Sequence, residues 1–439
     1  MRDEGIRIVF FHPSSFILFD ESFSTKWMSM RVIINGIAAL ERKTGVGYYI
    51  DSLYRQLLPQ SGDDDLVFYP QGVTRQAISF AREWLFKRTK KGATTFNSST
   101  EIKSAGLRLQ LPNLMGTSRE MARNVARRAC HKHFQRVADQ SGCTLYHEPN
   151  YIPWPCNLPT IVTILDLSVL LHPEWHPADR VKAYEQHFFR GLSYATHFIA
   201  ISEFTRQEMI DNLGIAPDRV TAIHIGVRPG FHPMPLSTVL PILQELDLEP
   251  GYLLYVSTIE PRKNLLTLMR AYCRLPDSLR EKHPLVLVGG WGWHAKEILD
   301  FYESNGREKN IRHFGYLPDS QLPAVFNGAR ALVYPSHYEG FGLPPVEMLA
   351  CGGADLASTA GSHLEVLQDQ AILIDPNDED RWQQEMRWIL EDDDHWQRMR
   401  RNSEAFAARY SWAECARKTW EVYRGVDRGS AEVEKRRAG

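Results

Sequence analysis

Residues 334–352 read YPSHYEGFGLPPVEMLACG, and this stretch decides the fold. The apolar run at 331–334 predicts a short buried strand that ends at Tyr334. A Gly-x-Gly loop follows, and the prolines at 344 and 345 suit the first turn of a helix, where a missing N–H breaks no bond. Strand, glycine-rich loop and helix in this order are typical of a doubly wound α/β domain, whose ligands bind at the carboxyl ends of the strands.

This stretch carries two acidic residues in a position to bind hydroxyl groups. Glu339 lies on the predicted loop, and Glu347 lies one turn into the predicted helix. Backbone N–H groups at the helix start favour an anion or a hydroxyl. Each carboxylate can chelate a diol, one on a sugar and one on a ribose. The alternative interpretation is a helix cap with two incidental acids, which so long and specific a string disfavours.

The same order of elements begins twice in the chain. The run at 30–36 predicts a strand followed by a loop at 43–48 and a helix, and the pattern restarts at 252–257. Five prolines between 229 and 250 predict a linker. We therefore predict an α/β protein with two Rossmann-like, doubly wound domains facing a cleft. The predicted parts are an N-terminal extension at 1–29, a first domain at 30–235, a second domain at 236–408, a last helix at 409–425 and a flexible tail at 426–439.

Composition narrows the class of protein. The chain has 439 residues, 43% hydrophobic and 24% charged, which excludes a disordered chain, a collagen-like fibre and a polytopic membrane protein. The net charge of −2 gives no whole-protein reason to expect nucleic acid. The six cysteines show no CxxC spacing, so neither a zinc site nor a redox motif is predicted, and scattered single cysteines indicate a cytosolic protein.

Residues 82–136 differ from the rest in charge. They hold thirteen Lys or Arg and three Glu, a net charge of +10, with apolar residues between them. Such a segment suits an anionic membrane surface, where each nearby cation contributes about 1 kcal/mol. The alternative is an ordinary solvated loop and helix.

A second string, Glu260-Pro-Arg-Lys-Asn264, follows the first strand of the second domain. Arg262 offers a planar fork and Lys263 a point charge, and together they suit a diphosphate leaving group. A solvated turn is the alternative. No DxD-like motif stands at a predicted strand end, so we expect no cofactor and no essential metal, and the two cations take over charge neutralisation.

Two further features of the first domain are weaker signals. Gly45 and Gly47 could let the backbone approach the diphosphate, although a tight turn is the commoner reason for such glycines. His147 ends a predicted strand and could line the cleft on the acceptor side, although a lone histidine is more often structural.

Together these strings resemble the retaining GT-B glycosyltransferases of family 4, most closely the bacterial polysaccharide mannosyltransferases. The resemblance covers most of the chain and is carried by residues 44–47, 201–205, 225–227, 260–264, 315–316, 339–347 and 361–366. It implies a nucleotide-diphospho-sugar donor, with GDP-mannose favoured, and a lipid-linked saccharide acceptor in exopolysaccharide or O-antigen biosynthesis. It also implies that the last helix crosses back to the first domain. The expected location is the cytoplasm, peripherally at the inner face of the plasma membrane.

The resemblance also assigns roles to residues. Glu347 would bind the ribose hydroxyls, and Glu339 would hold the sugar hydroxyls. Backbone N–H groups of Gly340, Phe341, Gly342 and Leu343 would assist Glu339, and the loop at Tyr316 would frame the base and the sugar. Retention would follow a front-face attack in which the leaving phosphate accepts the proton of the acceptor.

One position departs from the family pattern. The string Thr163-Ile-Leu165-Asp166 has leucine where related enzymes often have histidine. Asp166 remains and could meet the sugar or the acceptor. The departure leaves a second function open, a catalytically impaired, nucleotide-sugar-binding partner of a glycosyltransferase complex. A GT-B-like epimerase or phosphorylase is a weaker alternative.

Overall fold

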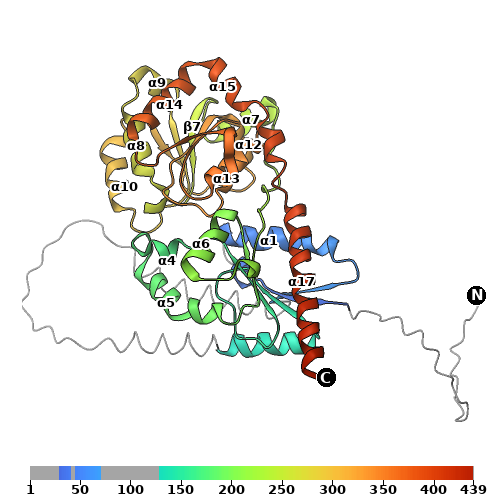
Figure 1. The fold of residues 1–439 in the computed structure, drawn as a ribbon. Coiled ribbons are helices and arrows are strands. Elements are labelled where there is room, and N and C mark those ends of the chain that lie inside the picture. Colours follow the sequence, from blue (N-terminus) through green and yellow to red (C-terminus); the bar gives the residue numbers. More distant parts are fainter. Residues whose placement is uncertain (1–28, 41–44, 71–127, 439) are drawn as a thin grey trace, which may run out of the picture.

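The computed structural model describes residues 29–40, 45–70 and 128–438. These residues form two α/β domains, one above the other in Figure 1, each built on a six-stranded parallel sheet. This is the predicted GT-B arrangement. The predicted extension at 1–29 and most of the basic segment 82–136 lie outside the described residues.

The N-terminal sheet has the strand order β2-β1-β3-β4-β5-β6. Its strands are β1 (Arg31–Asn35), β2 (Asp65–Tyr69), β3 (Leu145–Glu148), β4 (Thr160–Ile164), β5 (His197–Ala200) and β6 (Val220–Ala222). The helices of this domain are α1 (Gly45–Leu57), residues 128–140, α4 (Ser168–Leu171), α5 (Ala178–Leu192) and α6 (Glu203–Leu213). Helices cover both faces of the sheet, which is why the strands are continuous apolar runs.

The C-terminal sheet has the order β12-β11-β10-β7-β8-β9. Its strands are β7 (Tyr252–Val256), β8 (Leu285–Val288), β9 (Ile311–His313), β10 (Ala329–Tyr334), β11 (Asp355–Ser358) and β12 (Ala371–Ile374). Its helices are α7 (Leu236–Glu245), α8 (Leu265–Cys273), α9 (Asp277–Lys282), α10 (Lys296–Phe301), α11 (Leu322–Gly328), α12 (Leu343–Ala350), α13 (His363–Leu367), α14 (Glu379–Glu391), α15 (Asp393–Arg400) and α16 (Ser403–Ala407).

The long helix α17 (Trp412–Ala438) joins the two domains and packs along α1, as predicted (Figure 1). The rings of Tyr49 and Trp412 lie 5.9 Å apart, and Trp420 donates a hydrogen bond to the carbonyl of Leu57 at 3.0 Å. The helix does not end at 425, however, so the predicted tail at 426–439 is helical as far as Ala438. Val426 packs against the core and extends the apolar stripe of the helix by another turn.

Two local predictions differ from the structure. The proline-rich stretch 229–250 is not all linker, because α7 forms inside it and carries Pro241. The loop predicted at 43–48 gives way to helix at Gly45, where α1 begins. In the described residues, no helix is both long enough and apolar enough to span a bilayer.

Candidate active site

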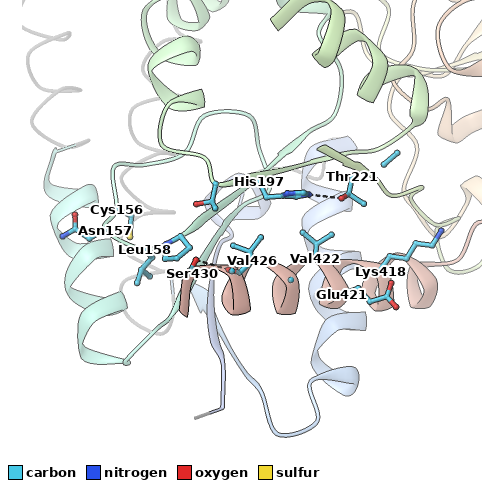
Figure 2. A pocket seen from close by; sticks show the side chains of 15 residues that line it. Cys156, Asn157, Leu158, His197, Thr221, Lys418, Glu421, Val422, Val426 and Ser430 are labelled. Atoms are coloured by element: carbon cyan, nitrogen blue, oxygen red, sulfur yellow. Dashed lines mark hydrogen bonds between the residues drawn. The ribbon is translucent and has the colours of Figure 1, made fainter. Parts of the chain in front are cut away.

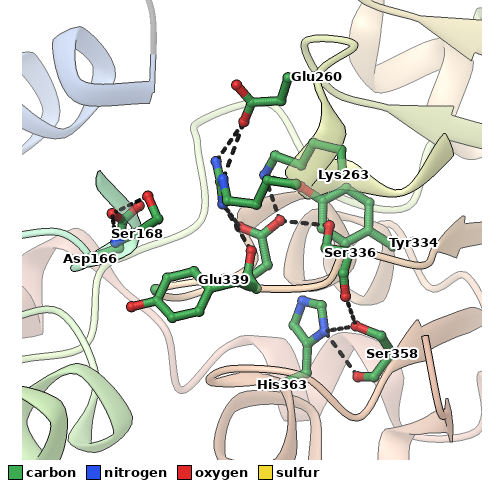
Figure 3. Close-up of polar contacts among 12 residues, drawn as sticks. Asp166, Ser168, Glu260, Lys263, Tyr334, Ser336, Glu339, Ser358 and His363 are labelled. Carbon is green, nitrogen blue, oxygen red and sulfur yellow. Dashed lines mark hydrogen bonds and ion pairs between the residues drawn. The ribbon is translucent and has the colours of Figure 1, made fainter. Parts of the chain in front are cut away.

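The loop after β10 carries a buried carboxylate held by two cations (Figure 3). Glu339 Oε1 lies 2.5 Å from Lys263 Nζ, and Glu339 Oε2 lies 3.3 Å from Arg262 Nη1. Ser336 donates a further hydrogen bond to Oε1 at 2.8 Å. The predicted sugar-binding acid and the predicted diphosphate-binding cations therefore belong to one cluster.

Neighbouring strands bring this cluster together. Arg262 and Lys263 lie in the short 3-10 helix η5 (Pro261–Lys263) after β7, and β7 pairs directly with β10. Glu260 holds Arg262 from the other side, with Oε1 2.9 Å from Nη2. Two cations thus face two carboxylates at the carboxyl edge of the sheet, where α/β proteins bind ligands.

The charges of this cluster follow from its geometry. Burial opposes ionisation of Glu339, but Lys263 and Arg262 outweigh burial and hold the pKa of Glu339 at about 2. Burial and the neighbouring Arg262 lower the pKa of Lys263, while Glu339 opposes that shift. Glu339 is therefore a carboxylate at neutral pH, able to accept hydrogen bonds from sugar hydroxyls.

The glycine-rich loop after Glu339 approaches the N-terminal domain so closely that Gly340 has no room for a side chain. A Cβ at Gly340 would lie 1.9 Å from the carbonyl oxygen of Leu165. Gly342 has a φ of +87°, and α12 begins directly after it. The side chain of Phe341 packs between the rings of His224 and Tyr410, so only its backbone is in a position to serve a ligand.

Leu165 and Asp166 stand on the N-terminal side of this approach. Position 165 is a leucine, so no imidazole occurs at this point. Its side chain packs against the hydrophobic core. Asp166 accepts hydrogen bonds from the backbone and the hydroxyl of Ser168, at 3.0 and 2.8 Å (Figure 3). The pKa of Arg262 is raised despite burial, because Glu339 first and then Asp166 favour its charged form. Asp166 therefore faces the cation cluster across the domain boundary.

Glu347 has a partner that the sequence did not predict. Its carboxylate is fully buried and makes a two-pronged contact with Arg228, whose Nη2 lies 2.7 Å from Oε2 and whose Nε contacts Oε1. Burial raises the pKa of Glu347, and Arg228 opposes that shift. Arg228 directly follows the string 225–227 used for the family resemblance, so its place next to that string was the available signal.

Tyr48, the neighbour of the predicted donor residue Gly47, lies near Arg228. The ring of Tyr48 lies 5.0 Å from the Arg228 guanidinium. Tyr48 directly follows Gly47, and both Gly45 and Gly47 lie in the first turn of α1 rather than in a loop. Burial first, and then Asp319 and Tyr316, raise the pKa of Tyr48, and the side chain of Tyr316 is itself exposed.

We predicted that His147 could line the cleft on the acceptor side, but the structure places it elsewhere. Its ring is fully buried, with Nδ1 2.7 Å from the hydroxyl of Tyr423 and Nε2 2.8 Å from Thr163 Oγ1. Burial lowers its pKa to about 3, so the ring is neutral. Successive strand residues point to opposite faces. The sequence predicted where the strand ends but not which side chain points to which face of the sheet. Glu148, the residue after His147, is the one that lines a cavity.

His363 is a second residue that the sequence did not single out. Its Nδ1 lies 3.0 Å from the carbonyl oxygen of Ser358, and a Cβ on Gly342 would lie 2.7 Å from its Nε2. Among the described residues, Nε2 has no hydrogen-bond partner although it is fully buried. Burial lowers the pKa of His363, while the nearby Glu339 opposes that shift. The neutral ring of His363 thus packs against the glycine-rich loop at Gly342.

A hollow of about 1100 Å³ lies elsewhere, between α17 and the start of β5 (Figure 2). His197, Thr221 and Val426 are among its lining residues, and none of the predicted site residues lines it. Within the described ranges, no group of three or more His, Cys, Asp or Glu is arranged to hold a metal ion. That no metal is needed remains a prediction.

Comparison with known families divides the chain in the same way as the structure. The model of the family described as "Glycosyltransferase Family 4" matches residues 115–231. The model described as "Glycosyl transferases group 1" matches residues 243–406. The two matches fall on the N-terminal and C-terminal domains, respectively.

Two curated relatives come from Escherichia coli. The O-antigen chain mannosyltransferase B is 36% identical over 282 residues, which cover 64% of this chain and 74% of that protein. The serotype-specific mannosyltransferase WbdA is 31% identical over 288 residues, or 64% of this chain. The match covers only 35% of WbdA.

Solved structures support the fold. Anabaena HepE in complex with UDP-glucose superposes with a TM-score of 0.61 at 15% identity, covering 90% of this chain and all of that one. Sucrose-phosphate synthase from Thermosynechococcus elongatus has a TM-score of 0.61 at 18% identity, covering 91% of this chain and 99% of that one.

Proposed function

Because this chain belongs to the family-4 glycosyltransferases, we propose that it transfers mannose from GDP-mannose, with retention of configuration, to a lipid-linked saccharide. The names of the two curated relatives support mannose as the sugar, and the name of the first supports the O-antigen as the product. The proposal rests mainly on one observation. Glu339 forms ion pairs with both Lys263 and Arg262 at the carboxyl edge of the C-terminal sheet.

The donor would use the charges of this cluster. Its diphosphate would lie against Arg262 and Lys263, which neutralise the negative charge that grows on the leaving group. The Glu339 carboxylate would accept hydrogen bonds from the sugar hydroxyls, and the start of α12 would offer backbone N–H groups. The ribose hydroxyls would donate to Glu347, which already shares its oxygens with Arg228.

The chemical step would occur on one face of the sugar. The bond between the anomeric carbon and the phosphate oxygen breaks, and a bond to the acceptor oxygen forms on the same face. The departing phosphate oxygen takes the acceptor's proton, so no side chain has to act as a base. Asp166, opposite Arg262, would orient the acceptor or the sugar from the N-terminal domain.

A second function, that of a donor-binding partner without turnover, is favoured by one observation. The side chain at position 165 is a leucine packed against the core, where the related enzymes often present a histidine to the donor. The two functions differ in turnover and not in donor binding.

The experiment is a transfer assay with the full chain. GDP-mannose, UDP-glucose and ADP-glucose are offered with a synthetic lipid-linked α-mannoside, and the product is analysed by mass spectrometry and by NMR at the anomeric carbon. We expect transfer from GDP-mannose to give an α-linked product. Binding of GDP-mannose without any product would favour the partner function. A β-linked product would contradict retention.

We also propose that the enzyme acts at the cytoplasmic face of the plasma membrane. The +10 charge of residues 82–136 supports this location. Flotation with vesicles containing 30% anionic lipid tests it. We expect binding at low salt that is lost at high salt, and equal binding to neutral vesicles would contradict it.

A further inference from the structure

The donor loop, residues 335–342 between β10 and α12, carries Tyr338 directly before Glu339. The side chain of Tyr338 is 4% exposed and reaches the N-terminal domain. Its hydroxyl accepts the backbone N–H of Leu167 at 3.0 Å and donates a hydrogen bond to the Glu208 carboxyl. Leu167 directly precedes α4, and Glu208 lies on α6. One hydroxyl therefore joins the donor loop to two elements of the other domain.

The ring of Tyr338 packs against two rings of the N-terminal domain. Its centroid lies 5.7 Å from that of His172 and 5.7 Å from that of Phe204, edge to face in both cases. Such contacts come from the aromatic ring, so a phenylalanine at this position would keep them. The role of the hydroxyl can therefore be tested separately from the packing.

The backbone at Tyr338 holds Arg262. The guanidinium Nη1 of Arg262 donates to the carbonyl of Tyr338 at 2.9 Å. The backbone N–H of His337 donates in turn to the carbonyl of Arg262 at 2.8 Å. The donor loop thus fixes both the main chain and the charged group of Arg262, and a shift of Tyr338 would move an acceptor of that guanidinium.

Helix α6 contacts the donor loop at a second point. The hydroxyl of Ser202, the N-cap of α6, donates to the carbonyl of Gly340 at 2.7 Å, and Thr205 Oγ1 lies 3.5 Å from the same oxygen. Ser202, Thr205 and Glu208 follow one another at intervals of three, and residues three apart are neighbours on a helix surface. One side of α6 therefore contacts the donor loop at both Tyr338 and Gly340.

A carboxylate of the C-terminal domain binds the start of the same helix. Glu365, on α13, accepts the backbone N–H of Glu203 at 2.8 Å and that of Phe204 at 2.9 Å. Amides in the first turn of a helix have no partner inside the helix. The protection of these two amides against hydrogen exchange therefore depends on contact between the two domains.

We propose that Tyr338 is a positioning residue, whose hydroxyl binds Glu208 and Leu167 and thereby places Arg262 for the diphosphate when the two domains are in contact. Tyr338 acts through Arg262 and not by touching a substrate. The inference rests on the proposed function for the role of Arg262. The contact between the domains does not depend on which sugar or acceptor is used.

The test uses variants that remove single hydrogen bonds, each with a matched control. Tyr338→Phe removes only the hydroxyl. Its control is Tyr272→Phe, because the hydroxyl of the buried Tyr272 donates to the carbonyl of His283 at 3.0 Å inside the C-terminal domain. Glu208→Ala removes the acceptor, while Glu208→Gln keeps an amide oxygen in its place. Glu245→Gln, on the exposed side of α7, is the control for this second pair. Circular dichroism confirms that each variant is folded.

The first readout is hydrogen exchange of the full chain, measured by mass spectrometry with fragmentation to single residues. Leu167 loses its own acceptor in Tyr338→Phe, so the decisive amides are those of Glu203 and Phe204, whose acceptor is unchanged. We expect both to exchange about five-fold faster or more in Tyr338→Phe and in Glu208→Ala, the effect of losing one hydrogen bond. Glu208→Gln should lie closer to the natural protein, and both controls should match it. Unchanged exchange in folded Tyr338→Phe and Glu208→Ala would overturn the inference.

The second readout ties the hydroxyl to Arg262 through a double-mutant cycle on the Kd for GDP, measured by calorimetry. We expect Tyr338→Phe to weaken GDP binding about five-fold in the natural background and less than about two-fold in the Arg262→Ala background, because the two residues act as a unit. An equal loss in both backgrounds would overturn the role assigned to Tyr338. Absence of sugar transfer by the natural protein, with this coupling intact, would count against the proposed function and not against this inference.

Discussion

Glu339 and Glu148 are both buried carboxyl groups at the carboxyl edge of a parallel sheet, and their surroundings give them opposite charge states. Lys263 and Arg262 outweigh the effect of burial and hold the pKa of Glu339 at about 2. Glu148 has only neutral donors, and burial raises its pKa to about 8. The neighbours, and not the depth of burial, therefore decide whether a buried acid is ionised.

The two carboxyl groups also differ in what surrounds them. In the C-terminal site, Arg262 and Lys263 pair with carboxylates, and the same two cations could pair with the phosphates of a nucleotide diphosphate. The N-terminal cavity beside Glu148 is lined by aromatic rings and Asn35, and also by Arg128 and Arg190.

The largest effect should follow from removing the charge of Glu339. Glu339→Gln leaves Lys263 and Arg262 without their shared carboxylate and removes the acceptor for the sugar hydroxyls. We expect transfer from GDP-mannose to fall by about 100- to 1,000-fold, the loss typical of a group that stabilises a transition state. Steady-state kinetics measure it. A Glu339→Gln enzyme as active as Glu245→Gln would remove Glu339 from the site.

A smaller effect should follow from Arg228→Gln on the donor side. The change leaves the buried carboxylate of Glu347 without its charged partner, and breaking such a pair is costly. We expect the KM for GDP-mannose to rise about ten- to 100-fold, with the melting temperature lowered. Arg228→Lys keeps the charge but not the planar fork, so it should restore only part of the affinity. Full restoration by lysine would show that the two-pronged geometry is unimportant.

Glu148 should make the free energy of unfolding depend on pH. Its pKa is about 8 in the fold and about 4.5 when exposed, so the folded state binds more protons between these values. Its contribution to stability therefore falls as pH rises through this window, by about 1.4 kcal/mol per pH unit. Glu148→Gln stays neutral, so the variant should gain stability relative to the natural protein between pH 5 and 7. Chemical denaturation at several pH values measures the difference, and a constant difference would contradict a raised pKa.

The smallest effect on activity should come from His147. Its ring is enclosed by Tyr423 and Thr163 and reaches neither substrate. We expect His147→Gln to keep both KM values and the turnover number within about two-fold, at some cost in melting temperature. A ten-fold rise in the acceptor KM would restore His147 to the acceptor side.

The sequence predicted most of the fold because the strands are short apolar runs followed by glycine or proline signals. It also singled out Glu339, Arg262 and Lys263 as site residues, and these follow β10 and β7, which pair in the sheet. That β7 lies beside β10, so that the three side chains meet, is known only from the structure.

What the sequence could not predict depends on side-chain direction and on contacts between distant elements. Arg228 reaches Glu347 across 119 positions, and its place after the string 225–227 does not reveal this partner. His147 and Glu148 are neighbours, so only the orientation of β3 decides which one reaches the cavity. The helical continuation of α17 beyond 425 depends on Val426 packing against the core, which overrides the weak helix preference of Gly425 and Gly429.

The most direct test of the contrast is to titrate the two carboxyl groups themselves. Carbon-13 NMR of protein labelled at the glutamate side-chain carboxyl identifies each resonance by its absence in Glu339→Gln or Glu148→Gln. We predict that the Glu148 resonance titrates near pH 8, while that of Glu339 keeps its ionised chemical shift down to the lowest pH at which the protein stays folded. Titration of both resonances near pH 4.5 would contradict the account.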